Sequence, residues 1–521
     1  MKWLWIGGPS LAAMLALAGA SSVRASEAGT IAIYVDCGKV VNTMRGGLGA
    51  SWHAMETPIP HGVRGPTRES YTEAGSGWGG YPPAEDERAW QQICRHAEWL
   101  GLDWNRVEIE QRIYEPERNK FTFDSPEMRI LYRILDWNQR KGADVFFQQM
   151  WCNAAWLAYP AVRDDPARRV HSAPVDVDAF ADGLATLMEH LLKKRGYTCI
   201  KWLCINNEPG ADFSWWQAPG NKPLSIGSGV AAVRKALDKR GLKLPLSGPD
   251  FTNGFLDKPS GIDYLGLLGA YDFHDYGADF DFRTRGHIVA EERGAAAWVA
   301  LARREGKPLF LSEFGTMAYG WMPDKPGPNC PQSALAAAEF VVRLANAGVD
   351  GFNRWSFLNR GDLDGQWQLV DTWDRREKKL LRDFPPHENS YFCLGLLSRF
   401  TAKHSAVLGS RVEGGKVADW QRVFCAAFRS PRGNLTLAIV NDAPLEFNLK
   451  LAMQGLPQPA RLCRYCYSEA ERDRADVKVD PQREVSVGLA SPTFSDKLPP
   501  NSLTIYSTYK LRHDEPGVIT E

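Results

Sequence analysis

Residues 200–210 read IKWLCINNEPG, and this short stretch decides the fold that the sequence predicts. Its first six residues are apolar enough for a buried strand. Two amides and the carboxylate of Glu208 follow, and Pro209-Gly210 then ends the regular structure. A carboxylate is costly to bury unless it is paired or hydrogen-bonded. A strand that ends in Glu208 therefore indicates an ion pair or a functional site.

The same pattern, an apolar segment that ends in polar residues, recurs along the first two thirds of the chain. The segments are GGLGASWHAM (46–55), DWNRVEIE (103–110), ADVFFQQMWCN (143–153), IKWLCINNE (200–208), LPLSGPD (244–250), YLGLLGAYDFHDY (264–276), PLFLSEFG (308–315) and DGFNRWSFLN (350–359). Helical patterns closed by Lys, Arg or Gly lie between them, at 85–101, 126–142, 176–196, 229–241 and 332–348.

Strands that alternate with helices over about 310 residues favour a (β/α)8 TIM barrel, which belongs to the α/β class. A doubly wound open sheet is the alternative. The chain has no G-x-G-x-x-G after its first strand and no G-x-x-x-x-G-K-[ST], so the barrel is the better prediction.

The pattern changes near Val407 to short β-type runs such as RVFCAAF and NLTLAIVND, which predict a C-terminal β-sandwich. We expect a barrel over residues 46–405 and a sandwich over 406–521. An N-terminal strand within residues 26–45, at Thr30 to Asp36, is expected to join the sandwich.

The first 25 residues have the plan of a secretory signal peptide, with a Lys, an apolar run and small residues before the cleavage site. We therefore expect a secreted or periplasmic protein, and no later segment is apolar enough to insert stably in a membrane. The chain has 62 basic and 62 acidic residues, so no net field attracts nucleic acid. The oligomeric state stays open.

Ten cysteines permit disulfides in an exported chain without requiring them. Cys463 and Cys466 form one C-x-x-C, and no second ligand pair at zinc-site spacing accompanies it. Buried thiols or a local disulfide are expected there. The sequence indicates no metal site and no organic cofactor, and a structural Ca²⁺ stays open.

The active site of a (β/α)8 barrel lies at the C-terminal ends of its strands. Two carboxylates directly follow apolar runs there, Glu208 in the fourth segment and Glu313 in the seventh. Either one alone could pair with an Arg or cap a helix. The other strand ends carry Trp52, His53, Arg106, Glu108, Trp151, Asn153, Asn207, Asp250, His274, Tyr276 and Trp355. This ring of polar and aromatic residues favours a catalytic pair.

Retaining glycosidases need two carboxyl groups about 5 Å apart, one as nucleophile and one as acid and then base. Like charges at that distance repel by roughly 3 kcal/mol at an effective dielectric constant near 20. That repulsion favours a site in which one carboxyl is protonated and its partner is ionised.

INNEP at the fourth strand and LSEFG at the seventh resemble clan A of the retaining glycoside hydrolases, a group of (β/α)8 enzymes. The resemblance covers residues 46–360, and the trailing β-domain is similar to families 30 and 39 more than to family 5. It implies that Glu208 is the acid/base, which holds a proton, and that Glu313 is the ionised nucleophile. It further implies that Asn207 binds the sugar 2-hydroxyl and that Arg106 supports the nucleophile.

The same resemblance makes His274 and Tyr276 the strand-six pair of which the Tyr contacts the nucleophile, and Trp355 the floor of the sugar subsite. Each has an alternative as an ion-paired, core or packing residue. His53, Trp151 and Asn153 are further candidates for substrate binding. Trp52, Trp215 and Trp216 are as consistent with packing, and Asp250 receives no role.

The sequence thus predicts a secreted retaining glycoside hydrolase that cleaves β-linked sugars of a polysaccharide or oligosaccharide. A non-catalytic carbohydrate-binding protein on the same scaffold and a transglycosylase are the alternatives. No H-E-x-x-H and no G-x-S-x-G supports other hydrolytic chemistry. The long loop from about residue 56 to residue 83 is either a wall over the substrate or a loop packed on the barrel rim. The sugar, the linkage and the choice between exo and endo action stay open.

Overall fold

The computed structural model describes residues 29–53, 82–211, 214–220, 222–251, 259–276, 286–315, 330–358, 368–374, 379–415, 417, 422–468 and 483–509 of the 521-residue chain. The signal peptide and residues 56–81 of the long loop, for both of which the sequence analysis makes predictions, lie outside the described residues. Within the described ranges, no helix has the length and apolar character needed to cross a membrane.

Eight parallel strands close into a barrel in sequence order, and β11 pairs back with β2 to complete the ring. The strands are β2 (Gly47–Ser51), β3 (Trp104–Ile109), β4 (Asp144–Gln149), β5 (Ile200–Cys204), β8 (Leu246–Phe251), β9 (Leu268–Asp275), β10 (Leu309–Phe314) and β11 (Gly351–Arg354). Seven of them lie inside one of the eight apolar segments of the sequence, and β8 extends one residue beyond its segment, to Phe251. The predicted TIM barrel is confirmed.

Helices follow most of these strands, and the sequence explains where several of them begin and end. The α-helices are α2 (Glu87–Leu100), α3 (Gln111–Tyr114), α4 (Pro126–Lys141), α5 (Pro166–Arg169), α6 (Val177–Glu189), α7 (Gly227–Lys239), α8 (Gly286–Glu305), α9 (Pro331–Ala347) and α10 (Glu388–Ser398). Asp86 caps α2 by accepting from the Ala89 N–H at 3.0 Å, and Gly101 ends it in the left-handed region. A π-turn, His190–Lys194, extends α6, and short 3-10 turns occupy Ala155–Leu157, Pro160–Val162 and Leu265–Leu267.

A second sheet of nine strands contains the C-terminal part of the chain. Its order is β19-β18-β21-β16-β15-β14-β1-β17-β20. The strands are β1 (Thr30–Met44), β14 (Ser405–Glu413), β15 (Val423–Arg429), β16 (Leu435–Asn441), β17 (Phe447–Gln454), β18 (Ala460–Ser468), β19 (Arg483–Val487), β20 (Thr493–Leu498) and β21 (Ser502–Ser507). The N-terminal strand β1 lies between β14 and β17, so the chain passes through this sheet before it enters the barrel.

The nine-stranded sheet curls around its own core. Its edge strands β19 and β20 meet, since Arg483 Nη1 on one donates to Asp496 Oδ1 on the other at 2.8 Å. Alternate residues of β15 and β16 face this core, among them Cys425, Leu437 and Ile439. The predicted C-terminal β-sandwich is confirmed. Two small hairpins complete the strands, β6–β7 (Gln217–Ala218 and Lys222–Pro223) and β12–β13 (Trp373–Asp374 and Lys379–Leu380).

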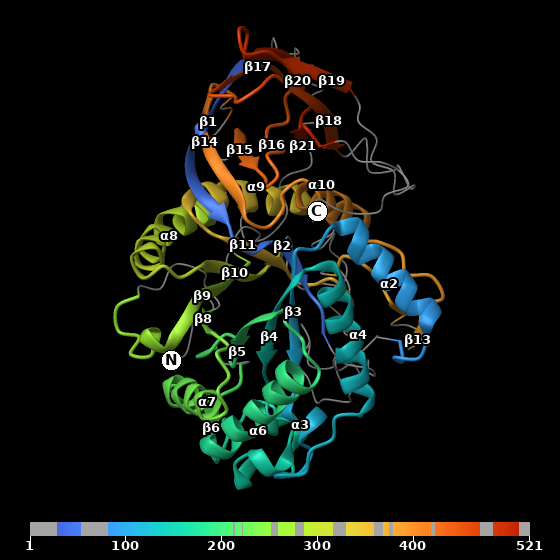
Figure 1. Ribbon diagram of the computed structural model, residues 1–521, viewed down its shortest axis with the longest axis vertical. Helices are drawn as coiled ribbons and strands as arrows, with labels where there is room; N and C mark the ends of the chain where they lie inside the picture. Colours follow the sequence, from blue (N-terminus) through green and yellow to red (C-terminus); the bar gives the residue numbers. More distant parts are fainter. Residues whose placement is uncertain are drawn as a thin grey trace, which may run out of the picture.

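The outer face of the second sheet packs on the barrel through two helices. Figure 1 shows the sheet at the top, the barrel below it, and α9 and α10 between them. Residues of opposite parity on β15 and β16, such as Phe428 and Val440, belong to one continuous apolar core with barrel residues such as Leu344. A buried bond between Tyr467 Oη and Asn389 Oδ1, at 2.8 Å, also crosses this contact. The two parts therefore share one core.

The inside of the barrel changes from apolar to polar along the strands. At the N-terminal side, Trp104, Phe146, Trp202, Ala270 and Phe310 pack against one another inside the barrel. Residues two positions further on face the same way, because side chains alternate along a strand. They are Arg106, Gln148, Cys204, Asp272 and Ser312, and all are fully buried. The apolar layer closes one end of the barrel, and polar side chains collect toward the other.

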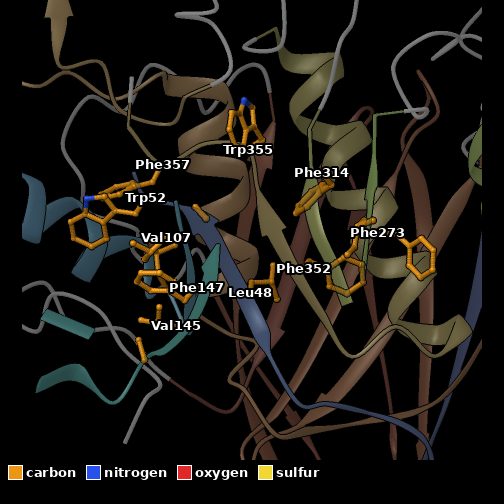
Figure 2. Close-up of a cluster of buried hydrophobic side chains, with 14 of the residues drawn as sticks. Leu48, Trp52, Val107, Val145, Phe147, Phe273, Phe314, Phe352, Trp355 and Phe357 are labelled. Carbon is orange, nitrogen blue, oxygen red and sulfur yellow. The ribbon is translucent and has the colours of Figure 1, made fainter. Parts of the chain in front are cut away.

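The outward-facing residues of the strands form the layer between the barrel and its helices. Figure 2 shows part of it, with Leu48, Val107, Phe147 and Phe352 beside their strands. The tryptophan-rich part of this layer explains one candidate from the sequence. Trp52 is fully buried, and its ring lies 5.0 Å from that of Phe357 and 5.5 Å from that of Trp137. Trp52 therefore packs in the core.

Candidate active site

Unusual backbone geometry marks the C-terminal ends of three neighbouring barrel strands. Trp151 after β4, Glu208 after β5 and Asp250 in β8 have positive φ angles of 61°, 50° and 62°. Residues other than glycine adopt this region rarely, and such positions cluster at functional sites. The Glu208 N–H donates to the Asp250 carbonyl oxygen at 3.1 Å, which ties two of these strand ends together.

Glu208 and Glu313 face each other across the barrel end. A carboxylate oxygen of Glu208, one of Glu313 and a ring nitrogen of His274 all lie within 4.8 Å of one another. His274 Nδ1 is 3.0 Å from Glu208 Oε1 and 3.4 Å from Glu313 Oε2. Both carboxylates are 6% exposed, so they are largely removed from water while one edge stays accessible. The structure thus brings together the two acids that the sequence analysis paired.

Donors surround the Glu313 carboxylate. Arg106 Nη1 donates to Oε2 at 2.7 Å, and Tyr276 Oη donates to Oε1. The Tyr276 ring reaches Glu313 past Gly315, where an added Cβ would lie 2.8 Å from Tyr276 Cε1. The final glycine of LSEFG therefore makes room for the tyrosine.

Burial and charge act in opposite directions on Glu313. Burial raises the pKa of its carboxyl, His274 and Arg106 lower it, and Glu208 and Glu108 raise it, with a net upward direction. This direction alone would favour a protonated Glu313, against the expected role. The contacts favour the carboxylate, because Arg106 offers only hydrogens to Oε2 and the nearby His274 Nδ1 is protonated as well. Donors on both oxygens stabilise the anion directly and so favour the ionised form of Glu313.

His274 is a cation in this environment. Burial lowers the pKa of its imidazole, but Asp250 and Glu313 raise it, Arg106 lowers it, and the net direction is well above the usual value. Its Nε2 lies 2.8 Å from Asp250 Oδ1 and 3.4 Å from Arg106 Nη2. The Nε2 hydrogen goes to the carboxylate, so the contact with the guanidinium is not a hydrogen bond. Both ring nitrogens then carry hydrogens, and Nδ1 donates to Glu208.

Asn207 and Trp355 border the same group. Arg106 Nη2 donates to Asn207 Oδ1 at 2.9 Å, which fixes the amide so that Nδ2 is the donor left for another partner. The Arg106 guanidinium lies 5.5 Å from the centre of the Trp355 ring, and the His53 ring lies 4.9 Å from it. Asn207, Arg106, His274, Tyr276, Trp355 and His53 therefore form one connected group with the two acids.

Trp151 and Asn153 lie further along the chain after β4. The Trp151 ring meets His171 edge-on, with 6.3 Å between ring centres. Asn153 is 6% exposed, and neither atom of its amide has a hydrogen-bond partner within the part of the chain that the structure describes. Trp215 and Trp216 pack against Phe180, and Trp216 Nε1 donates to the Ser225 carbonyl. These two tryptophans are core residues.

The structure adds two buried acids to the site. Glu108 Oε1 accepts from the same Arg106 Nη1 that serves Glu313, at 2.5 Å, and its Oε2 is 2.8 Å from His53 Nδ1. Asp250 bonds to His274. The sequence places Glu108 two residues after Arg106 and Asp250 at a strand tip, so their positions were visible. Their partners come from other strands, and only closure of the barrel reveals them.

Glu208, His274 and Glu313 lie close enough together to hold an ion, and so do Cys204, Asp250 and Asp272. A histidine ligates a metal through an unprotonated nitrogen. In the first group both nitrogens of His274 carry hydrogens that go to carboxylates. Hydrogen bonds from the protonated imidazole therefore account for the close approach of Glu208, His274 and Glu313.

No protein-family model matches the chain, and no curated protein matches its sequence. Solved structures do match over most of its length. The catalytic domain of GH30 xylanase C from Talaromyces cellulolyticus aligns with a TM-score of 0.59 at 12% identity and covers 91% of this chain and 99% of its own. A GH30 endoxylanase from Clostridium papyrosolvens aligns with a TM-score of 0.57 at 12% identity, covering 91% and 99%.

An α-L-arabinofuranosidase from Thermotoga maritima, solved with arabinose, aligns with a TM-score of 0.56 at 12% identity and covers 92% of this chain and 100% of its own. In each case the alignment spans barrel and sandwich together. The resemblance to clan A glycoside hydrolases, found in two short motifs, is thus confirmed for the fold over about nine tenths of the chain. This chain has the barrel-and-sandwich fold of these glycoside hydrolases.

Proposed function

We propose that this protein is a retaining glycoside hydrolase in which Glu313 is the nucleophile and Glu208 the acid/base. The single observation that carries the proposal is the carboxylate pair at the C-terminal end of the barrel, with an oxygen of each within 4.8 Å of the other. Retaining enzymes hold their carboxyl groups about 5 to 5.5 Å apart, and inverting enzymes leave about 6.5 to 9.5 Å for a water molecule. The observed spacing supports retention.

In the first step, a Glu313 oxygen attacks the anomeric carbon while Glu208 gives its proton to the leaving glycosidic oxygen. The C–O bond of the substrate breaks, and a glycosyl ester of Glu313 forms. Arg106 and Tyr276 hold the Glu313 carboxylate in place. His274 donates to Glu208 Oε1, which leaves Oε2 as the oxygen that carries the transferable proton.

In the second step, Glu208, now ionised, takes a proton from water, and the water oxygen attacks the anomeric carbon. The ester bond breaks, Glu313 is released as a carboxylate, and Glu208 is protonated again. The charge of Glu208 changes in both steps while the His274 cation stays next to it. Asn207, whose Oδ1 is occupied by Arg106, offers Nδ2 to a sugar hydroxyl, and Trp355 offers an aromatic face.

The substrate is a polysaccharide or one of its oligomers, and a β-linkage is our first choice. The solved structures of the same fold include xylanases and an arabinofuranosidase at similar TM-scores, so the fold itself does not select the sugar. A sugar in place of the water in the second step would give a transglycosylase with the same two acids. The apolar N-terminal segment supports action outside the cytoplasm.

The test is a panel of aryl glycosides and polysaccharides, assayed with wild type and with the matched variants Glu208→Gln and Glu313→Gln. We expect wild-type turnover with a first product of the same anomeric configuration as the substrate, read by proton NMR before mutarotation. We expect turnover of unactivated substrates to be lost in both variants. A first product of inverted configuration, or full activity in Glu313→Gln, would overturn the proposal. Sugar binding without turnover would make the protein a carbohydrate-binding module.

A further inference from the structure

Asp250, to which the sequence analysis gives no role, is buried beneath the proposed catalytic pair. It is fully buried in β8, and the described structure provides three hydrogen-bond donors to its carboxylate. His274 Nε2 lies 2.8 Å and Ser312 Oγ 3.3 Å from Oδ1, and Gln148 Nε2 lies 3.1 Å from Oδ2. These three contacts favour the ionised carboxylate, because each of the three groups presents a hydrogen to it.

Asp250 is connected to Glu208 in two ways, directly through the backbone and indirectly through His274. Its carbonyl oxygen accepts from the Glu208 N–H at 3.1 Å, and its side chain reaches the Glu208 carboxylate through His274. The imidazole spans the gap, since Nε2 meets Asp250 and Nδ1 meets Glu208 Oε1 at 3.0 Å. The same Nδ1 is 3.4 Å from Glu313 Oε2. His274 is therefore a positive charge placed between the two acids that would otherwise repel each other.

We propose that Asp250 is a positioning residue that keeps His274 doubly protonated, and so sets the pH range in which Glu208 and Glu313 can work. This inference rests on the proposed function for its catalytic consequence, while the protonation of His274 stands on the structure alone. No proton is exchanged with His274 during turnover. The transferred protons are those of Glu208 Oε2 and of water, and the imidazolium is a fixed charge.

The charged and titratable groups that face His274 in the described structure are Asp250, Glu208, Glu313, Arg106 and Asp272. Arg106 opposes the cation, and its own charge is engaged by Glu108 and Glu313. Glu208 and Glu313 change charge during the reaction. Asp250 bonds directly to His274 Nε2 and takes no part in the proposed proton transfers, so it is the acid among them suited to hold the proton on His274.

Asp272 is a natural control, because it is a second fully buried aspartate on the neighbouring strand. It lies close to Asp250 and Cys204. Burial and then Asp250 raise the pKa of the Asp272 carboxyl well above its usual range. Burial therefore favours the neutral form of Asp272, and its replacement by Asn is expected to change little charge near His274. Replacement of Asp250 by Asn removes one negative charge next to His274.

The experiment measures kcat/KM against pH for an aryl glycoside with wild type, Asp250→Asn and Asp272→Asn. Loss of the cation makes both catalytic carboxyls bind protons more readily, so we expect both limbs of the Asp250→Asn profile to move up by about one pH unit. We expect the limbs of Asp272→Asn to stay in place. Unchanged limbs in Asp250→Asn, or an equal shift in both variants, would overturn the inference.

A second measurement needs neither turnover nor a folded variant of Asp250. The ¹⁵N spectrum of wild-type protein labelled in its histidines should show His274 as an imidazolium up to pH 8, with its signals assigned by their loss in His274→Gln. Titration of His274 near its ordinary value would overturn the inference. If wild type hydrolyses no glycoside, the proposed function fails, and this spectrum still decides whether His274 is the cation that the inference requires.

Discussion

An oxygen of Glu208 and an oxygen of Glu313 lie within 4.8 Å of each other, although the two residues come from strands separated in the ring by β8 and β9. Closure of the barrel converts two unrelated strand ends into one site. The approach of two acids is tolerated because His274 and Arg106 place positive charge beside them. The two acids have different neighbours, and this difference supports the separate roles that we propose for them.

Glu208→Ala should be rescued by azide in a way that identifies the acid/base. The variant lacks the proton donor, so we expect kcat/KM to fall by roughly 100-fold to 10,000-fold for substrates with poor leaving groups and much less for activated ones. Azide can enter the space of the lost carboxylate and attack the glycosyl ester. The product should be a glycosyl azide of retained configuration, identified by NMR.

The matched variant Glu313→Ala should give the opposite result. Because this variant lacks the nucleophile, azide attacks the anomeric carbon of the substrate directly. The resulting glycosyl azide has inverted configuration. If the retained azide came from Glu313→Ala and the inverted one from Glu208→Ala, the two roles would have to be exchanged.

Tyr276→Phe removes the hydroxyl that donates to Glu313 Oε1 and keeps the ring. A hydrogen bond to a charged group contributes about 1.5–3 kcal/mol, so we expect kcat/KM to fall about 10-fold to 100-fold, with little change in melting temperature. Tyr467→Phe is the control, since its buried hydroxyl bonds to Asn389 at the contact between barrel and sandwich. That variant should lose stability and keep kcat/KM. Equal activity loss in both variants would show that Tyr276 acts only through packing.

Asp350→Asn should change how stability depends on pH. Burial raises the pKa of Asp350 to about 7, against the Leu309 N–H and the cations Arg45 and Arg303, which lower it. Its folded-state pKa is above the unfolded value, so the stability it contributes is full below about pH 4 and is lost as pH rises through 7. Asn keeps an acceptor for the Leu309 N–H, which lies 2.7 Å away, and has no charge to desolvate.

The melting temperature of Asp350→Asn relative to wild type should therefore increase steadily between pH 4 and pH 8. The control is Asp383→Asn, because the Asp383 side chain is 82% exposed and its ion pair with Arg88 is loose, at 3.7 Å. If the difference in melting temperature between Asp350→Asn and wild type stayed the same across this pH range, the inferred effect of burial on the Asp350 pKa would be contradicted.

The ten cysteines are free thiols, and eight of them are buried. We expect the melting temperature to be the same with and without dithiothreitol, because no cross-link constrains the unfolded chain. Thiol titration of the denatured protein should find ten reactive groups. A lower thiol count together with a fall in melting temperature on reduction would reveal a disulfide, and Cys463 and Cys466 would be examined first.

The barrel could be predicted from the sequence because its strands are buried on both sides and therefore stand out as apolar runs between amphipathic helices. Each of the eight predicted segments overlaps one barrel strand. At most strand tips, the residue named from the sequence belongs to the connected group around Glu208 and Glu313, and Asn153 is an exception. What the sequence could not show was pairing across the barrel, as with Glu108, which shares Arg106 with Glu313, and Asp250, which bonds to His274.

Aromatic residues were the least predictable part of the site. Trp52 and Trp355 both follow barrel strands, yet Trp52 packs beside Phe357 in the helix layer (Figure 2). Trp355 instead lies beside Arg106. Their sequence surroundings do not distinguish them, since both follow apolar strands. The difference is one of parity along the strand, which becomes visible only when the strand register is known.

The most direct test of the central claim is to trap the glycosyl ester with an activated 2-deoxy-2-fluoro glycoside and map it by mass spectrometry. The fluorine slows both steps, and a good leaving group keeps the first faster than the second, so the ester accumulates. We expect time-dependent inactivation and a single label on Glu313, within the peptide that contains LSEFG. A label on Glu208 or on any other residue would contradict the assignment.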